Sequence, residues 1–276
     1  MAPIRKGYQL DYEELSPNLA MGSVAVIPWD SAIFGFPVAS FRPGPGDLSY
    51  DQVDTLRCKF AAWMQEKNIA VCSSTLAPTQ SCWRQVLPQV GFEFVDLSLQ
   101  VALTLSSAKL PPVRSPVRLV LPEDHAAVEA IAAGSFSHGR YHADPRFPRH
   151  LANRRYLQWV RNVLGNPSEA DRMYVLELGG RVGGFHHVVI EGDNSDMRLA
   201  AVADDFKGTM LGADLYTATL HELRRQNIRR AVSSLSAANH GVINLFSMLG
   251  FRFSNPEIIY HWHAPSREPS GTRLSP

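Results

Sequence analysis

The chain has 276 residues, of which 45% are hydrophobic and 19% charged, and its formal net charge at pH 7 is +1. This composition excludes a disordered or collagen-like chain, and the near-neutral charge gives no general attraction to nucleic acid or anionic lipid. No apolar run approaches the roughly 20 residues of a membrane span, and no apolar segment typical of a secretory signal follows the N-terminus. The 3 cysteines lack the spacing of metal ligands, which favours a reducing compartment. We therefore expect a soluble cytoplasmic protein.

A proline-rich segment divides the sequence. Residues 106–116 contain prolines and small polar residues that can continue neither a helix nor a central strand. We therefore predict a small N-terminal α/β domain over 1–107 and a larger domain over 117–264. A polar tail follows at 265–276.

The first domain is predicted to alternate strands and helices. An apolar segment opens it at 24–29. Apolar residues recur at spacings of three and four over 52–67, which predicts a helix. A short strand at 69–72, a helix at 82–90 and a long strand at 92–105 follow.

The second domain is predicted to begin with a short strand and a helix, because Pro122 and two acidic residues form a typical helix start. The elements expected after it are a helix at 149–164, a hairpin at 173–178 and 182–190, a strand at 197–202, a helix at 211–225, a strand at 231–235, a helix at 241–249 and a strand at 251–263.

One pattern occurs in both domains. A predicted helix, a Gly-Phe pair and a strand follow one another over 80–103 and again over 239–262. A glycine that ends a helix before a strand is common, so a frequent turn is the simpler explanation. The alternative is a degenerate duplication, in which the first domain is a diverged copy of the second.

The loop between the strand at 197–202 and the helix at 211–225 is a candidate ligand site. Unpaired N–H groups at a helix N-terminus attract phosphate, glycines permit close approach, and Lys207 adds positive charge. The loop matches neither the P-loop pattern nor the dinucleotide-binding pattern. By its spacing alone, it is equally typical of an ordinary strand–helix connection.

The order of elements around this loop resembles the GNAT acyltransferase superfamily over about 117–264. In that family the loop carries Arg or Gln, then Gly, then Gly or Ala, at the positions held here by Lys207, Met210 and Gly212. Gly212 matches, Lys207 is a conservative change, and Met210 departs from the pattern. Asn239 stands where the family places an asparagine near the coenzyme.

The resemblance implies a mixed α/β fold with a splayed, mostly antiparallel sheet flanked by helices. It implies acetyl-CoA or another acyl-CoA as co-substrate, and an amine that attacks the thioester directly. An N–H group near Val202 would bind the thioester carbonyl. The residues it assigns to the coenzyme are Ala201, Val202, Lys207, Gly208, Thr209, Met210, Leu211, Gly212, Ala213, Asn239 and Phe246.

Proton transfer is the least determined part of the expected chemistry. His186 and His187 are candidates for the base, and alternation along a strand lets at most one face the site. A structural role is more common for a histidine in a strand. Phe246 replaces the tyrosine that the family commonly uses as the acid. Another group such as Tyr216 could serve, the thiolate could leave unassisted, or the protein could lack catalysis.

The loop at 136–147 is the candidate acceptor site, because its arginines suit phosphate oxygens. A solvated basic loop is the alternative. His138 and His142 have the spacing of a helical metal pair, but Gly139 argues against a helix, and we expect no metal.

The same loop resembles that of the family's bacterial dTDP-fucosamine acetyltransferases. The residues that carry this narrower resemblance are Phe136, Arg140, Tyr141, Asp144, Tyr156 and Trp159, with 29–35 resembling an N-terminal segment of those enzymes. The resemblance implies an amine on a nucleotide-linked sugar as acceptor. We assign its binding to His138, Arg140, Tyr141 and Asp144.

The leading hypothesis is therefore an N-acetyltransferase for an amino sugar or similar small molecule. The alternative is a catalytically silent acyl-CoA-binding or ligand-sensing module, which Met210 and Phe246 favour. Nucleic-acid binding through 140–161 is disfavoured by the neutral charge and the lack of a recognition motif. The oligomeric state stays open, with a dimer as one option.

Overall fold

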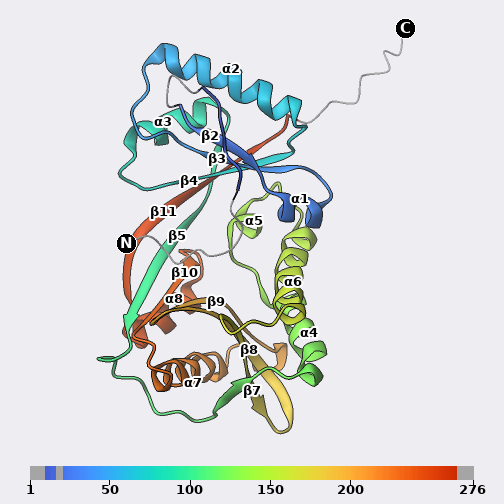
Figure 1. The fold of residues 1–276 in the computed structure, drawn as a ribbon, viewed down its shortest axis with the longest axis vertical. Helices are drawn as coiled ribbons and strands as arrows, with labels where there is room; N and C mark the ends of the chain where they lie inside the picture. The colour runs from blue at the N-terminus through green and yellow to red at the C-terminus, as the bar shows by residue number, and fades with distance from the viewer. Residues whose placement is uncertain (1–9, 17–20, 266–276) are drawn as a thin grey trace. The chain divides into compact units, whose positions relative to one another are not determined.

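The computed structural model describes residues 10–16 and 21–265, and its contacts divide the chain into two units (Figure 1). The large unit comprises Asp96–Ile258, and the small unit comprises the described residues before and after it. Two long strands, β5 (Glu93–Thr104) and β11 (Arg252–His263), belong in part to each unit. The boundary thus falls inside β5, whereas we expected it at 106–116. The expected tail beyond residue 265 lies outside the described residues.

The small unit has its helices between successive strands. Its elements are β1 (Glu13–Glu14), β2 (Ser23–Val26), α1 (Pro28–Phe34), β3 (Val38–Arg42), α2 (Tyr50–Glu66), β4 (Val71–Leu76) and α3 (Ser81–Gln89), with strand order β1-β2-β3-β4 followed by parts of β11 and β5. The helices expected at 52–67 and 82–90 are confirmed as α2 and α3. A buried aromatic group comprising Phe41, Phe60, Trp83 and Phe92 forms the centre of its core.

The large unit contains a sheet with the strand order β6-β7-β8-β9-β10-β5-β11. Its remaining elements are β6 (Val117–Leu119), α4 (His125–Ser135), α5 (Arg140–Ala143), α6 (Arg149–Gly165), β7 (Asp171–Leu178), β8 (Arg181–Glu191), β9 (Asn194–Val202), α7 (Leu211–Arg225), β10 (Arg230–Ser236) and α8 (His240–Met248). Neighbours from β6 to β9 are antiparallel, as are β10 and β5, while β9 and β10 are parallel. The expected mixed α/β fold with a mostly antiparallel sheet flanked by helices is confirmed.

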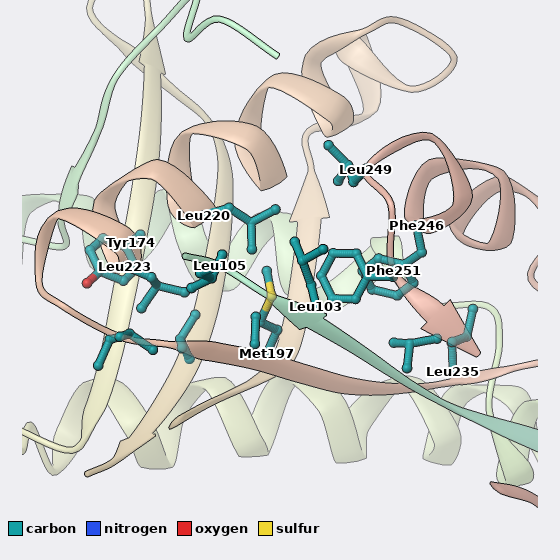
Figure 2. Packing of buried hydrophobic residues seen from close by; sticks show 14 residues of the cluster. Leu103, Leu105, Tyr174, Met197, Leu220, Leu223, Leu235, Phe246, Leu249 and Phe251 are labelled. Atoms are coloured by element: carbon teal, nitrogen blue, oxygen red, sulfur yellow. The ribbon is translucent and has the colours of Figure 1, made fainter. Parts of the chain in front are cut away.

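Helices cover both faces of this sheet. Tyr174 and Met197 point to the face that α7 and α8 cover, where they pack with Leu220 and Phe246 (Figure 2). Val188 belongs to the same core cluster. Strand residues of the opposite alternation, among them Met173, Val175 and Phe185, pack beneath α4 and α6. Each strand therefore contributes to two cores, which follows from its period of two. No helix in residues 10–16 or 21–265 is long and apolar enough to cross a bilayer.

The two units repeat one series of elements at a constant distance along the chain. β4, α3 and β5 begin at residues 71, 81 and 93, while β10, α8 and β11 begin at 230, 240 and 252, in each case 159 residues later. The turns agree as well. Phe92 N–H donates to Leu87 O at 3.0 Å, and Phe251 N–H donates to Phe246 O at 2.9 Å. The similarity therefore includes the spacing of the elements and the turn hydrogen bonds as well as the Gly-Phe pairs.

Candidate functional site

β9 and β10 pair over three residue pairs only, from Asn194–Arg230 to Asp196–Val232. The cause lies in β9, where Arg198 has no partner in β8 because His187 pairs with Leu199 and Val188 with Met197. Such a bulge bends a strand and increases its twist. Just before it, the Ser233 hydroxyl donates to Met197 O at 2.7 Å, and no further β9–β10 pair follows among the described residues. The ends of these two strands thus have unpaired edges.

The unpaired edge of β9 presents backbone N–H groups. Ala203 N–H donates to Gly183 O at 2.9 Å, so the odd-numbered residues at this end of β9 bond to β8. Since backbone groups alternate along a strand, Ala200 and Val202 point their N–H groups away from β8. The Val202 carbonyl, which points the same way, accepts a hydrogen bond from the Ser135 hydroxyl at 3.2 Å.

The loop that follows β9 leads into an open helix N-terminus. Gly208 has a φ of +78°, which favours glycine, and the Thr209 hydroxyl oxygen accepts from Leu211 N–H at 3.2 Å. In the described part of the chain, the N–H groups of Gly212 and Ala213 have no acceptor. A side chain added at Gly212 would meet no atom within 4 Å. The two N–H groups are therefore open to an anion.

Lys207 is exposed beside this loop but already carries an ion pair. Its Nζ lies 2.6 Å from Asp204 Oδ1 and donates to Gly134 O at 3.4 Å. The carboxylate offsets the charge that the sequence assigned to phosphate binding. Met210, the departure from the family pattern, is 53% exposed at the N-cap of α7.

Asn239 and Phe246 have structural roles at α8. The Asn239 side-chain oxygen accepts from Val242 N–H at 3.3 Å and caps the helix. Phe246 is 1% exposed in the core and packs edge-on against Tyr216 with ring centres 5.4 Å apart. The Phe246 side chain offers no surface to a coenzyme. Burial raises the pKa of Tyr216, which disfavours its ionised form.

His186 and His187 lie on opposite faces of β8, as alternation predicts, and both are fully buried. His186 Nδ1 lies 3.2 Å from Thr219 Oγ1, and burial lowers the pKa of His186 to about 3. His187 Nε2 lies 3.0 Å from Asp171 Oδ1. A base must reach its substrate, so burial disfavours both candidates, although their role as base stays a prediction.

The candidate acceptor loop contains a helix that we did not expect, since α5 makes one turn over Arg140–Ala143. His142 Nε2 lies 2.8 Å from Asn153 Oδ1 of α6, and this tertiary contact holds the turn. His138 is exposed, and its Nδ1 lies 3.1 Å from Ser137 Oγ. His138 and His142 do not share a helix, because His138 precedes α5 and Gly139 stands at its N-cap.

The other assigned acceptor residues differ in exposure. Tyr141 is buried against Phe147 with ring centres 4.7 Å apart, and it accepts a hydrogen bond from Arg140 at 3.3 Å. Asp144 is buried and accepts from Arg146 N–H at 2.9 Å. Tyr141 and Asp144 thus shape the loop, while His138 and the half-buried Arg140 reach its surface.

A buried carboxylate that the sequence analysis did not single out lies beside the end of β10. Asp96 of β5 is 6% exposed, and its Oδ1 accepts from the Ser236 hydroxyl at 2.8 Å and from Leu97 N–H at 2.9 Å. The one signal in the sequence is an acidic residue within the apolar strand 92–105. Only the pairing of β5 with β10 brings it to this place.

Comparison with known proteins places this geometry in a family. Residues 108–239 match the family model of the acetyltransferase (GNAT) domain. These residues form a GNAT acetyltransferase domain. The GNAT domain includes the divergence of β9 from β10 and the open N-terminus of α7, whereas Asp96 precedes it in the chain.

A curated relative and several solved structures are similar to the chain. The spore coat polysaccharide biosynthesis protein SpsD of Bacillus subtilis is 26% identical over 140 residues, which are 51% of this chain and 48% of the relative. The match thus spans about half of that protein's length. A GCN5-related N-acetyltransferase from Sphaerobacter thermophilus has a TM-score of 0.63 at 14% identity, covering 88% of this chain and 76% of its own. A tandem GNAT protein from the clavulanic acid biosynthesis pathway has a TM-score of 0.55 at 14% identity, covering 89% and 80%. At these identities the solved structures show that the chain shares their fold, and they carry no argument about its substrate.

Proposed function

We propose that the protein is an acyl-CoA-dependent N-acetyltransferase that acts on the amine of a nucleotide-linked amino sugar or similar small molecule. The observation that carries the proposal is the divergence of β9 from β10 beside the open N-terminus of α7, within the GNAT domain. This arrangement offers an acyl-CoA two kinds of binding group close together. One is the set of N–H groups that can bind an anion, and the other is an unpaired strand edge.

The residues of the loop fit the diphosphate of an acyl-CoA. The N–H groups of Gly212 and Ala213 are without acceptors among the described residues, and the space above Gly212 is open. A helix N-terminus with free N–H groups favours an anion by its dipole as well as by hydrogen bonds. Lys207 would add a charge if its ion pair with Asp204 opened.

The unpaired edge of β9 would hold the acyl end of the same co-substrate. The N–H groups of Ala200 and Val202 point away from β8 and can donate to the pantetheine amide and the thioester carbonyl. A fixed N–H group aimed at a carbonyl that becomes an oxyanion stabilises the transition state, and removing one such donor typically costs about 10²–10³-fold in rate.

Two observations support an acceptor that carries a nucleotide-linked sugar. The Bacillus subtilis relative is named for spore coat polysaccharide biosynthesis. The helix after the acceptor loop exposes Arg149 and Arg154, and neither has an ion-pair partner in the described part of the chain. Guanidinium groups suit the oxygens of a nucleoside diphosphate.

The experiment begins with calorimetric titrations of the whole protein with acetyl-CoA, free CoA and dTDP. We expect acetyl-CoA and dTDP to bind, and we expect thiol release when acetyl-CoA and a dTDP-linked amino sugar are supplied together. Binding of acetyl-CoA without thiol release in the presence of any amine tested would favour the silent binding module. The exposed Met210 and the buried Phe246 are the observations that favour that alternative. Absence of acetyl-CoA binding by folded protein would overturn both functions.

We also propose that the small unit is a diverged GNAT-like copy of the large unit. This is the duplication that the sequence analysis gave as the alternative to a frequent turn. The constant offset of 159 residues in β4, α3 and β5 supports it, since independent turns would not keep one spacing over three elements. The fold-level likeness to a tandem GNAT protein agrees with this origin.

A further inference from the structure

Asp96 occupies the face of the sheet on which the acceptor loop lies. Leu99, Val101 and Leu103 of β5 pack in the core beneath α7 and α8. Alternation therefore directs the even-numbered residues of β5, Asp96 included, to the opposite face. The charge of His138, in the acceptor loop, acts on Asp96, which agrees with this placement.

Asp96 lies at the open end of β10. Its partner Ser236 is the last residue of that strand and comes after the three pairs that join β10 to β9. Val202, whose N–H would bind the thioester carbonyl, ends β9 on the other side of the divergence. The carboxylate is thus beside the edges between which the acyl group would lie.

The hydrogen bonds of Asp96 occupy one carboxylate oxygen and leave the other without a described donor. Both described bonds, from the Ser236 hydroxyl and from Leu97 N–H, are accepted by Oδ1. Ser236 Oγ is held in turn, because it accepts from Ala238 N–H at 3.1 Å. Oδ2 accepts no hydrogen bond from any described residue. It is not one of the described polar atoms that are fully buried without a partner.

We propose that Asp96 is the general base that deprotonates the acceptor amine. The inference rests on the proposed function and adds a catalytic residue to it. Oδ2 takes a proton from the ammonium group, and the neutral nitrogen then bonds to the thioester carbonyl carbon. The carbon–sulfur bond breaks with its electron pair on sulfur, and the thiolate takes the second proton from the new amide nitrogen. Asp96 returns its proton to water, so the sum is an amide, a free thiol and one proton.

The surroundings of Asp96 suit this role. Burial raises the pKa of Asp96, while the hydrogen bonds from Ser236 and Leu97 and the charge of His138 act in the opposite direction. A carboxylate with a raised pKa is a stronger base that still ionises. His138 is the one ionisable side chain in the described residues whose charge acts on Asp96. On β11, beside β5, Glu257 is bound to Gln100 at 3.2 Å.

The decisive variant is Asp96→Asn, since an amide oxygen in the place of Oδ1 keeps both hydrogen bonds. The readout is thiol release from acetyl-CoA against pH, with a dTDP-linked amino sugar and with glucosamine as acceptors. We expect kcat/KM to fall by about 10²–10⁴-fold at neutral pH and the affinity for acetyl-CoA to stay within about 2-fold. The variant should regain activity as pH rises toward the amine pKa, where free amine no longer needs a base.

Two further variants keep the test decisive. Ser236→Ala removes a hydrogen bond that favours the ionised carboxylate, so the acidic limb of the kcat/KM profile should move to higher pH. Asp171→Asn removes the carboxylate that holds His187 and should leave the rate within about 2-fold.

Each result decides one way. An Asp96→Asn enzyme with the wild-type rate and pH profile would overturn the assignment while leaving the proposed function intact. An unmoved acidic limb in Ser236→Ala would overturn it even if the asparagine variant failed to fold. If wild-type protein binds acetyl-CoA but acetylates no amine, the proposed function and the base fail together.

Discussion

Asn68 and Asn227 adopt the same left-handed conformation, with φ of 51° and 61°, 159 residues apart. Each follows a long helix and precedes a strand, and the isoleucine after each donates its N–H five residues back, to Met64 O or Leu223 O. Asparagine tolerates this conformation better than most residues. Two matching helix ends, each followed by a strand, relate the units to each other. The starts of the two helices differ, and that difference has a functional consequence.

One acetyl-CoA should bind per chain. At the start of α2, Ser49 and Gln52 form a capping box: the Ser49 hydroxyl accepts from Gln52 N–H at 3.4 Å, and Gln52 Oε1 accepts from Ser49 N–H at 2.8 Å. The chain's own side chains thus occupy groups that a phosphate would need, whereas those of Gly212 and Ala213 stay open. Calorimetry should give a stoichiometry near one, and a value near two would contradict this account.

A bulky residue at Gly212 should weaken acyl-CoA binding without unfolding the protein. In Gly212→Arg the side chain projects into the open space that the diphosphate requires. We expect the affinity for acetyl-CoA to fall at least about 10-fold, as for the loss of about 1.4 kcal/mol. Gly165→Arg is the matched control, since a side chain there also meets no atom within 4 Å but lies at the end of α6. Equal binding by the two variants would show that the loop is not the phosphate site.

Removing the partner of Lys207 should strengthen coenzyme binding. Asp204→Asn abolishes an exposed ion pair, which costs little stability, and frees the ammonium for phosphate. We expect the Kd for acetyl-CoA to fall about 2- to 5-fold at low salt, with a smaller change at high salt because screening weakens exposed charges. Lys207→Ala should act in the opposite direction. If both variants bind as the wild type does, Lys207 takes no part.

The shape of the acceptor loop should depend on Gly139. Its φ is +129°, and an added Cβ would stand 2.5 Å from the Tyr156 hydroxyl, whose ring is stacked on Phe136. Gly139→Ala should therefore lower the free energy of unfolding by about 1–3 kcal/mol and raise the acceptor KM. Tyr156→Phe in the same background should recover part of the loss, since it removes the clash but leaves the backbone strain. Urea unfolding of the single and double variants measures both terms.

Acid should destabilise the large unit through His186. Its folded pKa is about 3, below the value near 6.5 in an unfolded chain, so the unfolded state binds the extra proton between these values. The stabilisation is complete above pH 6.5 and is lost as pH falls toward 3, at up to about 1.4 kcal/mol per pH unit. His186→Leu should reduce this slope between pH 6 and 4.5. An unchanged slope in urea unfolding would mean that the buried ring does not carry the effect.

Most of the elements follow from the sequence alone because their cause is local. Apolar spacing gave α2 and α7, and alternation put His186 and His187 on opposite faces, since period and handedness are properties of the backbone. The element order was enough to predict the GNAT fold and the loop before α7. The short helices α1 and α5 were missed, because one or two turns have too little periodicity and depend on contacts such as His142 with Asn153.

The site itself required the tertiary structure. No local pattern marks the bulge at Arg198, yet it separates β9 from β10. No local pattern around Asp96 predicts its hydrogen bond with Ser236, which lies 140 residues away. Strand pairing between distant segments depends on the whole sheet. Burial likewise depends on what packs above a residue, and it separated the enclosed His186 from the exposed His138. Sequence determined which elements form and in what order, while packing determined which side chains meet and which of them a ligand can reach.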